Sequence, residues 1–126
     1  MLGNRDVMAT VAVRDFDAAR RFYEQVLGLE ADQANGASGV AVYRCGGSRM
    51  VVYRSDFAGT NRATSATWGV GEELEAVVEA LRAKGVAFER YDIPGGEMRG
   101  DVHVFGDFRA AWFKDPDGNV LHVNSG

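Results

Sequence analysis

Apolar residues recur at helical spacing in two segments of the chain. In the first segment they share one face: Phe16, Ala19, Tyr23 and Val26. This spacing predicts an amphipathic helix from about Asp17 to Leu27. Asp15 stands where a side chain can accept from free backbone N–H groups, and Gly28 stands where a left-handed residue ends a helix. In the second segment Leu74, Val77 and Leu81 form the apolar stripe. That stripe predicts a helix over about 72–84, ended by Gly85.

The rest of the pattern repeats itself within the chain. At an offset of 57 residues, Ala9–Val13 matches Ala66–Val70, and both segments read as strands that precede a helix. At an offset of 70, Ala41–Arg44 matches 111–114 and Met50–Tyr53 matches 120–123. These matched pairs predict hairpins whose turns hold glycine. The difference between the two offsets places extra loop in the second half, at about 92–101.

Each half therefore reads as β-α-β-β-β, and the fold class is α+β. We expect one domain over 1–126, with module one at about 7–58 and module two at about 63–125. One helix covers only one face of each module's strands, so two modules side by side predict a curved sheet with an open cleft.

The composition and net charge of the chain narrow the classes of partner that we expect. The chain is 46% hydrophobic and 25% charged with a net charge of −4, and no basic run is present to follow a phosphate backbone. We therefore expect no nucleic-acid partner, and no membrane partner because no apolar run approaches the length of a span. The single Cys45 excludes an internal disulfide framework and favours a reducing compartment. The expected location is cytoplasmic.

Two motifs carry a resemblance to a known family. The segment 18–29 (AARRFYEQVLGL) and the turn 113–119 (FKDPDGN) resemble the glyoxalase/bleomycin-resistance/dioxygenase superfamily, also called vicinal oxygen chelate proteins. The resemblance covers the whole chain and implies the two-module fold. It also implies that a cleft completed by a homodimer binds a small molecule. Neither motif is catalytic, so both specify the fold far more than an activity.

In metal-dependent members of that superfamily, each half supplies two metal ligands. The repeat maps these positions onto four residues: Met8, Val52, Ser65 and His122. Of these only His122 is an ordinary ligand for a divalent cation that accepts oxygen substrates. We therefore expect no bound catalytic metal and no other cofactor. The alternative is a site rebuilt from His103, Glu97 or Asp101 in the long loop.

Strand alternation predicts which side chains line the cleft. The predicted ligand-binding residues are Thr10, Tyr43, Met50, Val52, Ser65, Thr67 and Phe113. Tyr43 and Phe113 are the expected stacking partners, whereas Tyr53, Trp68 and Trp112 alternate onto the helix side. Arg109 is expected to face the cleft and pair with an anionic group of the ligand, or else to pair with a carboxylate at the rim.

His122 is the candidate base, because its imidazole titrates near neutral pH; a packed histidine is the competing interpretation. Segment 91–97 is either a lid or a plain connection. Three functions stay open. The first is a metal-free binding protein for an aromatic or amphipathic molecule, similar to the bleomycin-resistance branch. The second is a metal-free isomerase, epimerase or cyclase, with His122 as the base and Arg109 stabilising the oxyanion, and the third is a metal-dependent lyase or dioxygenase.

Overall fold

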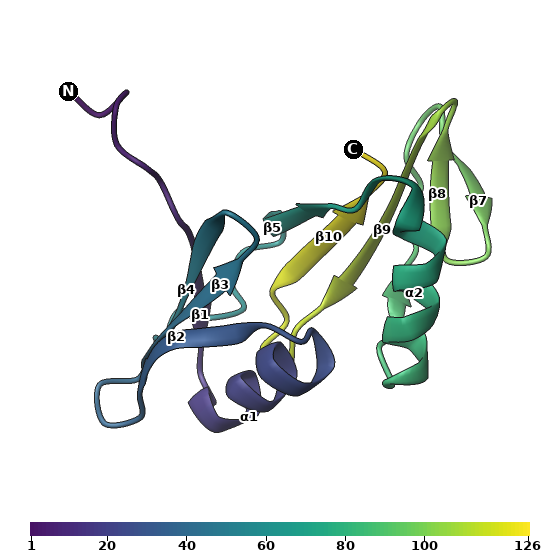
Figure 1. Ribbon diagram of the computed structural model, residues 1–126. Helices are drawn as coiled ribbons and strands as arrows, with labels where there is room; N and C mark the ends of the chain where they lie inside the picture. Colours follow the sequence, from purple (N-terminus) through teal and green to yellow (C-terminus); the bar gives the residue numbers. More distant parts are fainter.

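Two mixed β-sheets and two short helical regions form the structure, a computed structural model that describes residues 1–126 (Figure 1). The first sheet has the order β1-β4-β3-β2, and the second has the order β5-β10-β9-β8-β7 with β6 also paired to β9. The strands of the first sheet are β1 (Ala9–Val13), β2 (Glu30–Asn35), β3 (Val40–Cys45) and β4 (Ser48–Arg54). Those of the second are β5 (Thr64–Gly69), β6 (Phe88–Glu89), β7 (Glu97–Arg99), β8 (Val102–Phe105), β9 (Phe108–Lys114) and β10 (Val120–Asn124).

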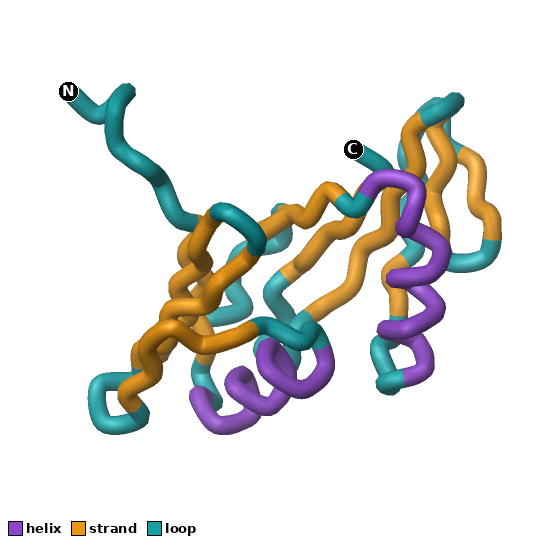
Figure 2. Tube along the Cα trace, viewed as in Figure 1, coloured by secondary structure: helices purple, strands orange, loops and turns teal.

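The two sheets repeat one plan. The first strand of each module pairs in parallel with the last strand, β1 with β4 and β5 with β10. The last strand then forms an antiparallel hairpin, β3 with β4 and β9 with β10. This confirms the predicted α+β fold of two βαβββ-like modules. The first eight residues form an arm of loop and turn that extends away from both sheets (Figure 2).

The helix of module one forms where the apolar stripe predicted it. It consists of α1 (Phe16–Arg21), continued by one π-helical turn, η1 (Phe22–Val26). Asp15 caps it by accepting a hydrogen bond from the Ala18 amide at 3.0 Å, and Gly28 ends it with a φ of 74°. Phe16, Ala19 and Tyr23 are buried, as expected.

The helix of module two begins with a 3₁₀ turn, η2 (Gly71–Glu73), and continues as α2 (Leu74–Ala83). Leu74, Val78 and Leu81 are buried, and Val77 packs partly against the same core. Gly85 follows with a φ of 90°. No helix of the structure is long and apolar enough to cross a membrane.

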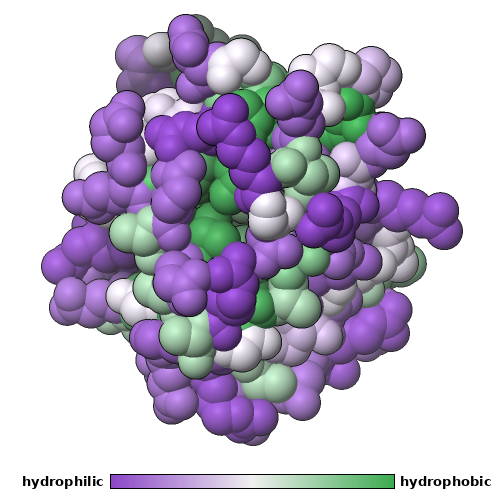
Figure 3. Space-filling model, turned by 90° about the vertical axis from the view of Figure 1, so that its right-hand side faces the viewer, coloured by the Kyte–Doolittle hydropathy of each residue, from purple (hydrophilic) through white to green (hydrophobic).

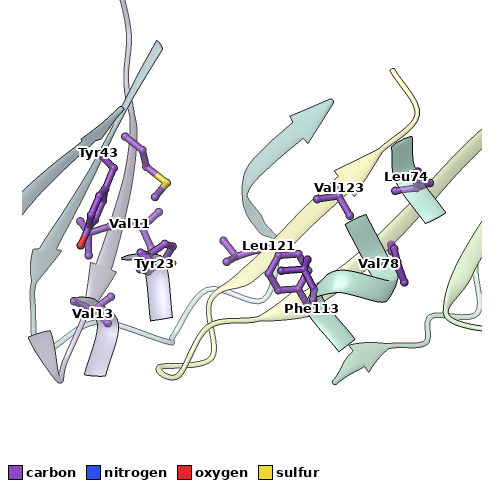
Figure 4. Packing of buried hydrophobic residues seen from close by; sticks show 14 of the residues in the cluster. Val11, Val13, Tyr23, Tyr43, Leu74, Val78, Phe113, Leu121 and Val123 are labelled. Carbon is purple, nitrogen blue, oxygen red and sulfur yellow. The ribbon is translucent and has the colours of Figure 1, made fainter. Parts of the chain in front are cut away.

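A single hydrophobic core joins the two modules. Residues of the first sheet, such as Val11 and Tyr43, and residues of the second, such as Leu121 and Phe113, belong to one buried cluster (Figure 4). The first helix contacts both sheets, because Tyr23 stacks on Tyr43 at 6.0 Å between ring centroids while Phe22 lies 6.5 Å from Phe113. The helix side of both sheets is therefore the interior of the protein.

A buried polar cluster also fastens module one to module two. The Tyr23 hydroxyl donates to Oδ2 of Asp115 at 2.8 Å. The side-chain amide of Asn119 donates to the same oxygen at 2.8 Å and to the Ala12 carbonyl at 2.7 Å. Asp115 and Asn119 are each 4% exposed. We call Tyr23, Asp115 and Asn119 the intermodule clamp.

The extra residues of module two form an excursion from the edge of its sheet. In module one β2 runs along β3 with a single irregularity between Ala31 and Gln33. In module two β6 and β8 share the corresponding edge of β9, and the chain between them, 90–101, leaves the edge and returns. The predicted loop at 92–101 is thus partly strand, because it contains β7, which pairs with β8. The face that carries α2 and this excursion is mostly hydrophilic, with a narrow hydrophobic strip exposed in its middle (Figure 3).

Candidate functional site

The helix-free face of the second sheet, opposite α2, brings His122 and Trp112 together. The two residues are register partners on β10 and β9, so their side chains emerge on the same face. Their rings stack with centroids 4.5 Å apart and planes 4° from parallel. Thr67, the partner of His122 on β5, places its Oγ1 3.4 Å from His122 Nδ1. Trp112 donates from Nε1 to Thr64 Oγ1 at 3.2 Å.

Two further rings extend this stack toward the sheet edge. His103 on β8 lies edge-on to Trp112 with ring centroids 4.9 Å apart. Tyr91, from the excursion, lies 5.7 Å from Trp112 and 6.1 Å from His103. The backbone amide of Tyr91 donates to His103 Nε2 at 2.9 Å. We call Tyr91, His103, Trp112 and His122 the aromatic row.

The surroundings of His122 favour the neutral form of its ring. Burial lowers the pKa of His122 below its ordinary value, and the neighbouring His103 lowers that pKa further. The Nε2 atom is buried and finds no hydrogen-bond partner among the groups of the protein. A neutral imidazole with one free ring nitrogen can accept or donate a hydrogen bond, and it can take up a proton from a bound molecule.

Four of the predicted ligand-binding residues face the interior instead of the helix-free side. Tyr43, Met50, Val52 and Phe113 are each 2% exposed or less and belong to the core cluster. The expected orientation of these strands was wrong. On the first sheet the helix-free face carries Thr10, Ala12 and their register partners Val51 and Tyr53. Tyr53 and Trp112, expected on the helix side, thus lie on the helix-free side.

For Met50 and Val52 the error has a physical cause in the hairpin turns. Four residues, 45–48, separate the paired Arg44 and Arg49 in module one, whereas five residues, 115–119, separate the paired Lys114 and Val120 in module two. The extra turn residue shifts the repeat by one position between β4 and β10. Because side chains alternate along a strand, a shift of one residue moves each side chain to the opposite face. His122 therefore corresponds to Val51, not to Val52.

Arg109 does not reach the aromatic row. Its guanidinium forms an ion pair with Glu75 of α2, and a second one with Glu72 at 3.7 Å. These contacts place it on the helix side of β9, with Ala111 and Phe113. Its expected position in the cleft was wrong, and the alternative of a carboxylate pair describes the structure. The pKa of Arg109 is raised by the hydrogen bond with Glu75.

The other predicted residues lie at separate places. Thr67 contacts His122, as described. Thr10 is exposed on β1, and Ser65 falls at the irregularity where β5 shifts register against β10. Met50 and Thr67 both line a pocket of about 410 Å³ between the β3–β4 turn, β1 and β5. This pocket is the meeting place of the two modules, and His122 does not line it.

Comparison with known proteins gives the family. The sequence model of the Glyoxalase/Bleomycin resistance protein/Dioxygenase superfamily matches residues 7–123. The chain belongs to this superfamily. A search of curated proteins finds no match.

Several solved structures share the fold of this chain. An integron cassette protein from the mobile metagenome of the Halifax Harbour sewage outfall has a TM-score of 0.72 and 20% identity, covering 97% of this chain and 99% of its own. The fosfomycin resistance protein FosX from Listeria monocytogenes, complexed with Mn(II) and 1S,2S-dihydroxypropylphosphonic acid, has a TM-score of 0.73 and 19% identity, covering 98% and 90%. FosX from Mesorhizobium loti has a TM-score of 0.70 and 15% identity, covering 98% and 92%. At these identities the likeness extends to the fold alone.

The residues of this superfamily member do not fit the divalent metal that the resemblance implies. The four mapped positions do not meet, because Val52 points into the core while His122 projects from the opposite side of its sheet. With the corrected register the corresponding helix-free positions are Thr10, Val51, Thr67 and His122. Only one of these four is an ordinary metal ligand. No group of three or more His, Cys, Asp or Glu residues is placed to hold a metal ion.

Sequence reasoning missed three members of the aromatic row. Strand alternation assigns Trp112 to the core, and the sequence offers His103 only as a substitute metal ligand. Tyr91 falls in a segment that the sequence leaves open as a lid or a plain connection. The sequence holds one signal that finds Trp112. Counting the extra residue of the Asp115–Asn119 turn pairs Trp112 with His122. Nothing comparable finds Tyr91 and His103, because their contact depends on how the excursion folds back.

Proposed function

We propose that this protein binds a small planar aromatic or amphipathic molecule on the aromatic row, without a metal ion. The observation that carries the proposal is the stacked pair of Trp112 and His122, in which a neutral imidazole keeps Nε2 free of protein partners. Aromatic side chains with one or two convergent polar atoms suit such a ligand. Stacking on Trp112 supplies affinity, and the ring nitrogen orients the ligand.

The family and the neighbouring structures support small-molecule binding. FosX from Listeria monocytogenes holds a dihydroxypropylphosphonic acid on the same fold. In this chain a ligand with several charged oxygens finds no cationic cluster on the row, whereas a flat ring finds Tyr91, Trp112 and His122. The proposed ligand is therefore more apolar than the one in that protein.

Tryptophan emission tests the proposal. The chain has two tryptophans, so Trp68→Phe leaves Trp112 as the only reporter. We expect saturable quenching by members of a panel of aromatic antibiotics and metabolites, unchanged by a chelator. The matched control is Trp112→Phe, in which Trp68 on the helix side should not respond. A panel without any saturable response would refute the proposal.

A second function, a metal-free isomerase, epimerase or cyclase, is favoured by one observation. His122 is kept neutral by burial and has a free Nε2, which are the properties of a general base near neutral pH. Arg109 takes no part, because Glu75 and Glu72 hold it on the helix side. Activity should survive chelation and fall in His122→Gln by about a hundredfold or more.

Elemental analysis of protein purified without chelators tests the third function, since a metal-dependent lyase or dioxygenase needs a stoichiometric metal.

We also propose that the protein is a homodimer. Apolar side chains on the helix-free face of the first sheet are exposed, with Val40 at 37% and Tyr53 at 38%, as are Val7 and Met8 in the N-terminal arm. A second copy that covers this face would remove apolar surface from water. Analytical ultracentrifugation tests this, and a monomer at micromolar concentration would contradict it. The cytoplasmic location favoured by the single cysteine stays a prediction.

A further inference from the structure

A pocket adjoins the aromatic row where the excursion folds over β8. It has a volume of about 290 Å³ and lies between His103 and the segment 90–98. His103 shares the helix-free face with Trp112, because its register partner on β9 is Ala110, two residues from Trp112. Tyr91 belongs both to the row and to the wall of this pocket. The row and the pocket are therefore continuous.

The contacts of His103 fix which of its nitrogens carries the proton. Its Nε2 accepts a hydrogen bond from the Tyr91 amide at 2.9 Å. A nitrogen that accepts is unprotonated, so the neutral ring carries its hydrogen on Nδ1. The His103 side chain is 1% exposed, and Nδ1 is buried with no acceptor among the groups of the protein. A buried donor without an acceptor is unfavourable, so a ligand oxygen that accepts from it gains affinity.

The charges around the pocket select against a charged ligand group. Arg90 and Asp92 both line it and carry opposite charges. The guanidinium of Arg90 also donates to the Gly100 carbonyl at 2.9 Å. The remaining wall includes Ile93 and Met98, which are apolar. An ionised group would lose its hydration here without gaining a net opposite charge.

We propose that this pocket takes an uncharged acceptor oxygen, such as the carbonyl of an aryl ketone, ester or amide, and that His103 Nδ1–H donates to it. The aromatic part of the same ligand then lies along Tyr91 and Trp112. His103 is in this way a specificity-determining residue. This inference rests on the proposed function, since it names the class of ligand that the aromatic row holds.

Matched small probes test the inference on the intact protein. The three probes have similar shapes and differ in one group. Acetophenone carries a neutral acceptor oxygen, ethylbenzene carries no acceptor, and benzoate carries a charged carboxylate. In NMR titrations we expect acetophenone to bind about tenfold more tightly than either of the others, as one hydrogen bond to a previously unpaired donor provides. Equal affinity of acetophenone and ethylbenzene would overturn the inference and leave the proposed function standing. If no planar compound binds, both fail.

Two substitutions separate ligand recognition from a purely structural role of His103. The side-chain amide nitrogen of His103→Asn takes the place of Nδ1 and keeps the donor, while the oxygen of His103→Gln takes the place of Nε2 and keeps the acceptor for Tyr91. We expect the preference for acetophenone to persist in the Asn variant and to vanish in the Gln variant. The opposite result would show that His103 only fastens Tyr91.

A measurement on the unaltered protein covers the case in which a variant fails to fold. The nitrogen chemical shifts of the His103 ring report its tautomer. We expect Nδ1 to be protonated, with its proton signal moving downfield when acetophenone is added. A ring protonated on Nε2, or an Nδ1 proton that does not respond to bound acetophenone, would overturn the inference.

Discussion

Removing one hydroxyl from the intermodule clamp should measurably lower the free energy of unfolding. In Tyr23→Phe, Oδ2 of Asp115 keeps the Asn119 amide but loses the Tyr23 donor. The ring of Tyr23 is fully buried and keeps its packing in the variant. The change therefore isolates a single hydrogen bond to a carboxylate that is almost entirely buried.

The size of the effect depends on the charge of Asp115. A hydrogen bond to a charged group contributes about 1.5–3 kcal/mol and one between neutral groups about 0.5–1.5 kcal/mol. Burial raises the pKa of Asp115, whereas the hydrogen bonds from Asn119 and Tyr23 lower it. Losing Tyr23 raises that pKa further, so the variant holds the ionised carboxylate less well. The variant should lose about 2 kcal/mol at pH 7, and less at lower pH, because the raised pKa lets Asp115 take up a proton earlier in an acid titration than an ordinary aspartate does.

Urea unfolding at pH 7 and pH 4 gives the two free energies. At this chain length the pH 7 loss corresponds to a fall in Tm of roughly 8 °C. Tyr43→Phe is the matched control, because its hydroxyl donates to Glu24, which also pairs with Arg20 near the surface. It should cost about 1 kcal/mol or less, because water can replace the lost hydroxyl at the partly exposed carboxylate of Glu24. The reasoning is refuted if Tyr23→Phe costs less than the control, or costs the same at both pH values.

Three further results are expected. The pH at the midpoint of the His122 imidazole titration, followed by NMR, should lie below 6.5, because burial disfavours the imidazolium. The stability that the neutral ring contributes should be lost as the pH falls through this midpoint. A midpoint above 6.5 would contradict the described surroundings of His122. Arg109→Gln should leave ligand binding unchanged and shift the urea midpoint little, since its partners Glu72 and Glu75 are exposed to solvent. Val77→Leu adds a methylene beside an entirely apolar pocket of about 160 Å³ and should raise stability by about 0.5–1 kcal/mol; a fall in Tm would show that the pocket cannot take it.

The helices of this protein were predictable because their signals are local. The apolar stripe, the Asp15 cap and the left-handed Gly28 all act within a few residues. The repeat of these signals at a fixed offset also predicted the two modules. The parallel pairing of the first and last strands then follows from the repeated plan.

The faces of the strands were less predictable, because the period of two leaves no tolerance for a miscounted residue. One extra residue in the Asp115–Asn119 turn reverses the sides assigned to Met50 and Val52 on β4, where the repeat alignment placed them. The apolar composition of both faces hid the slip, since Val51 and Val52 differ in environment but not in kind. Composition alone could not choose between the two registers.

The sequence by itself determined the two-module fold, its helices and the candidate His122. Only the tertiary structure decided what surrounds His122: Trp112 through strand pairing, and His103 with Tyr91 through the return of the excursion onto β8. The reason is that helix signals depend on neighbours in the chain, whereas this site is built from segments whose contacts form only when distant strands pair and one inserted segment folds back over them.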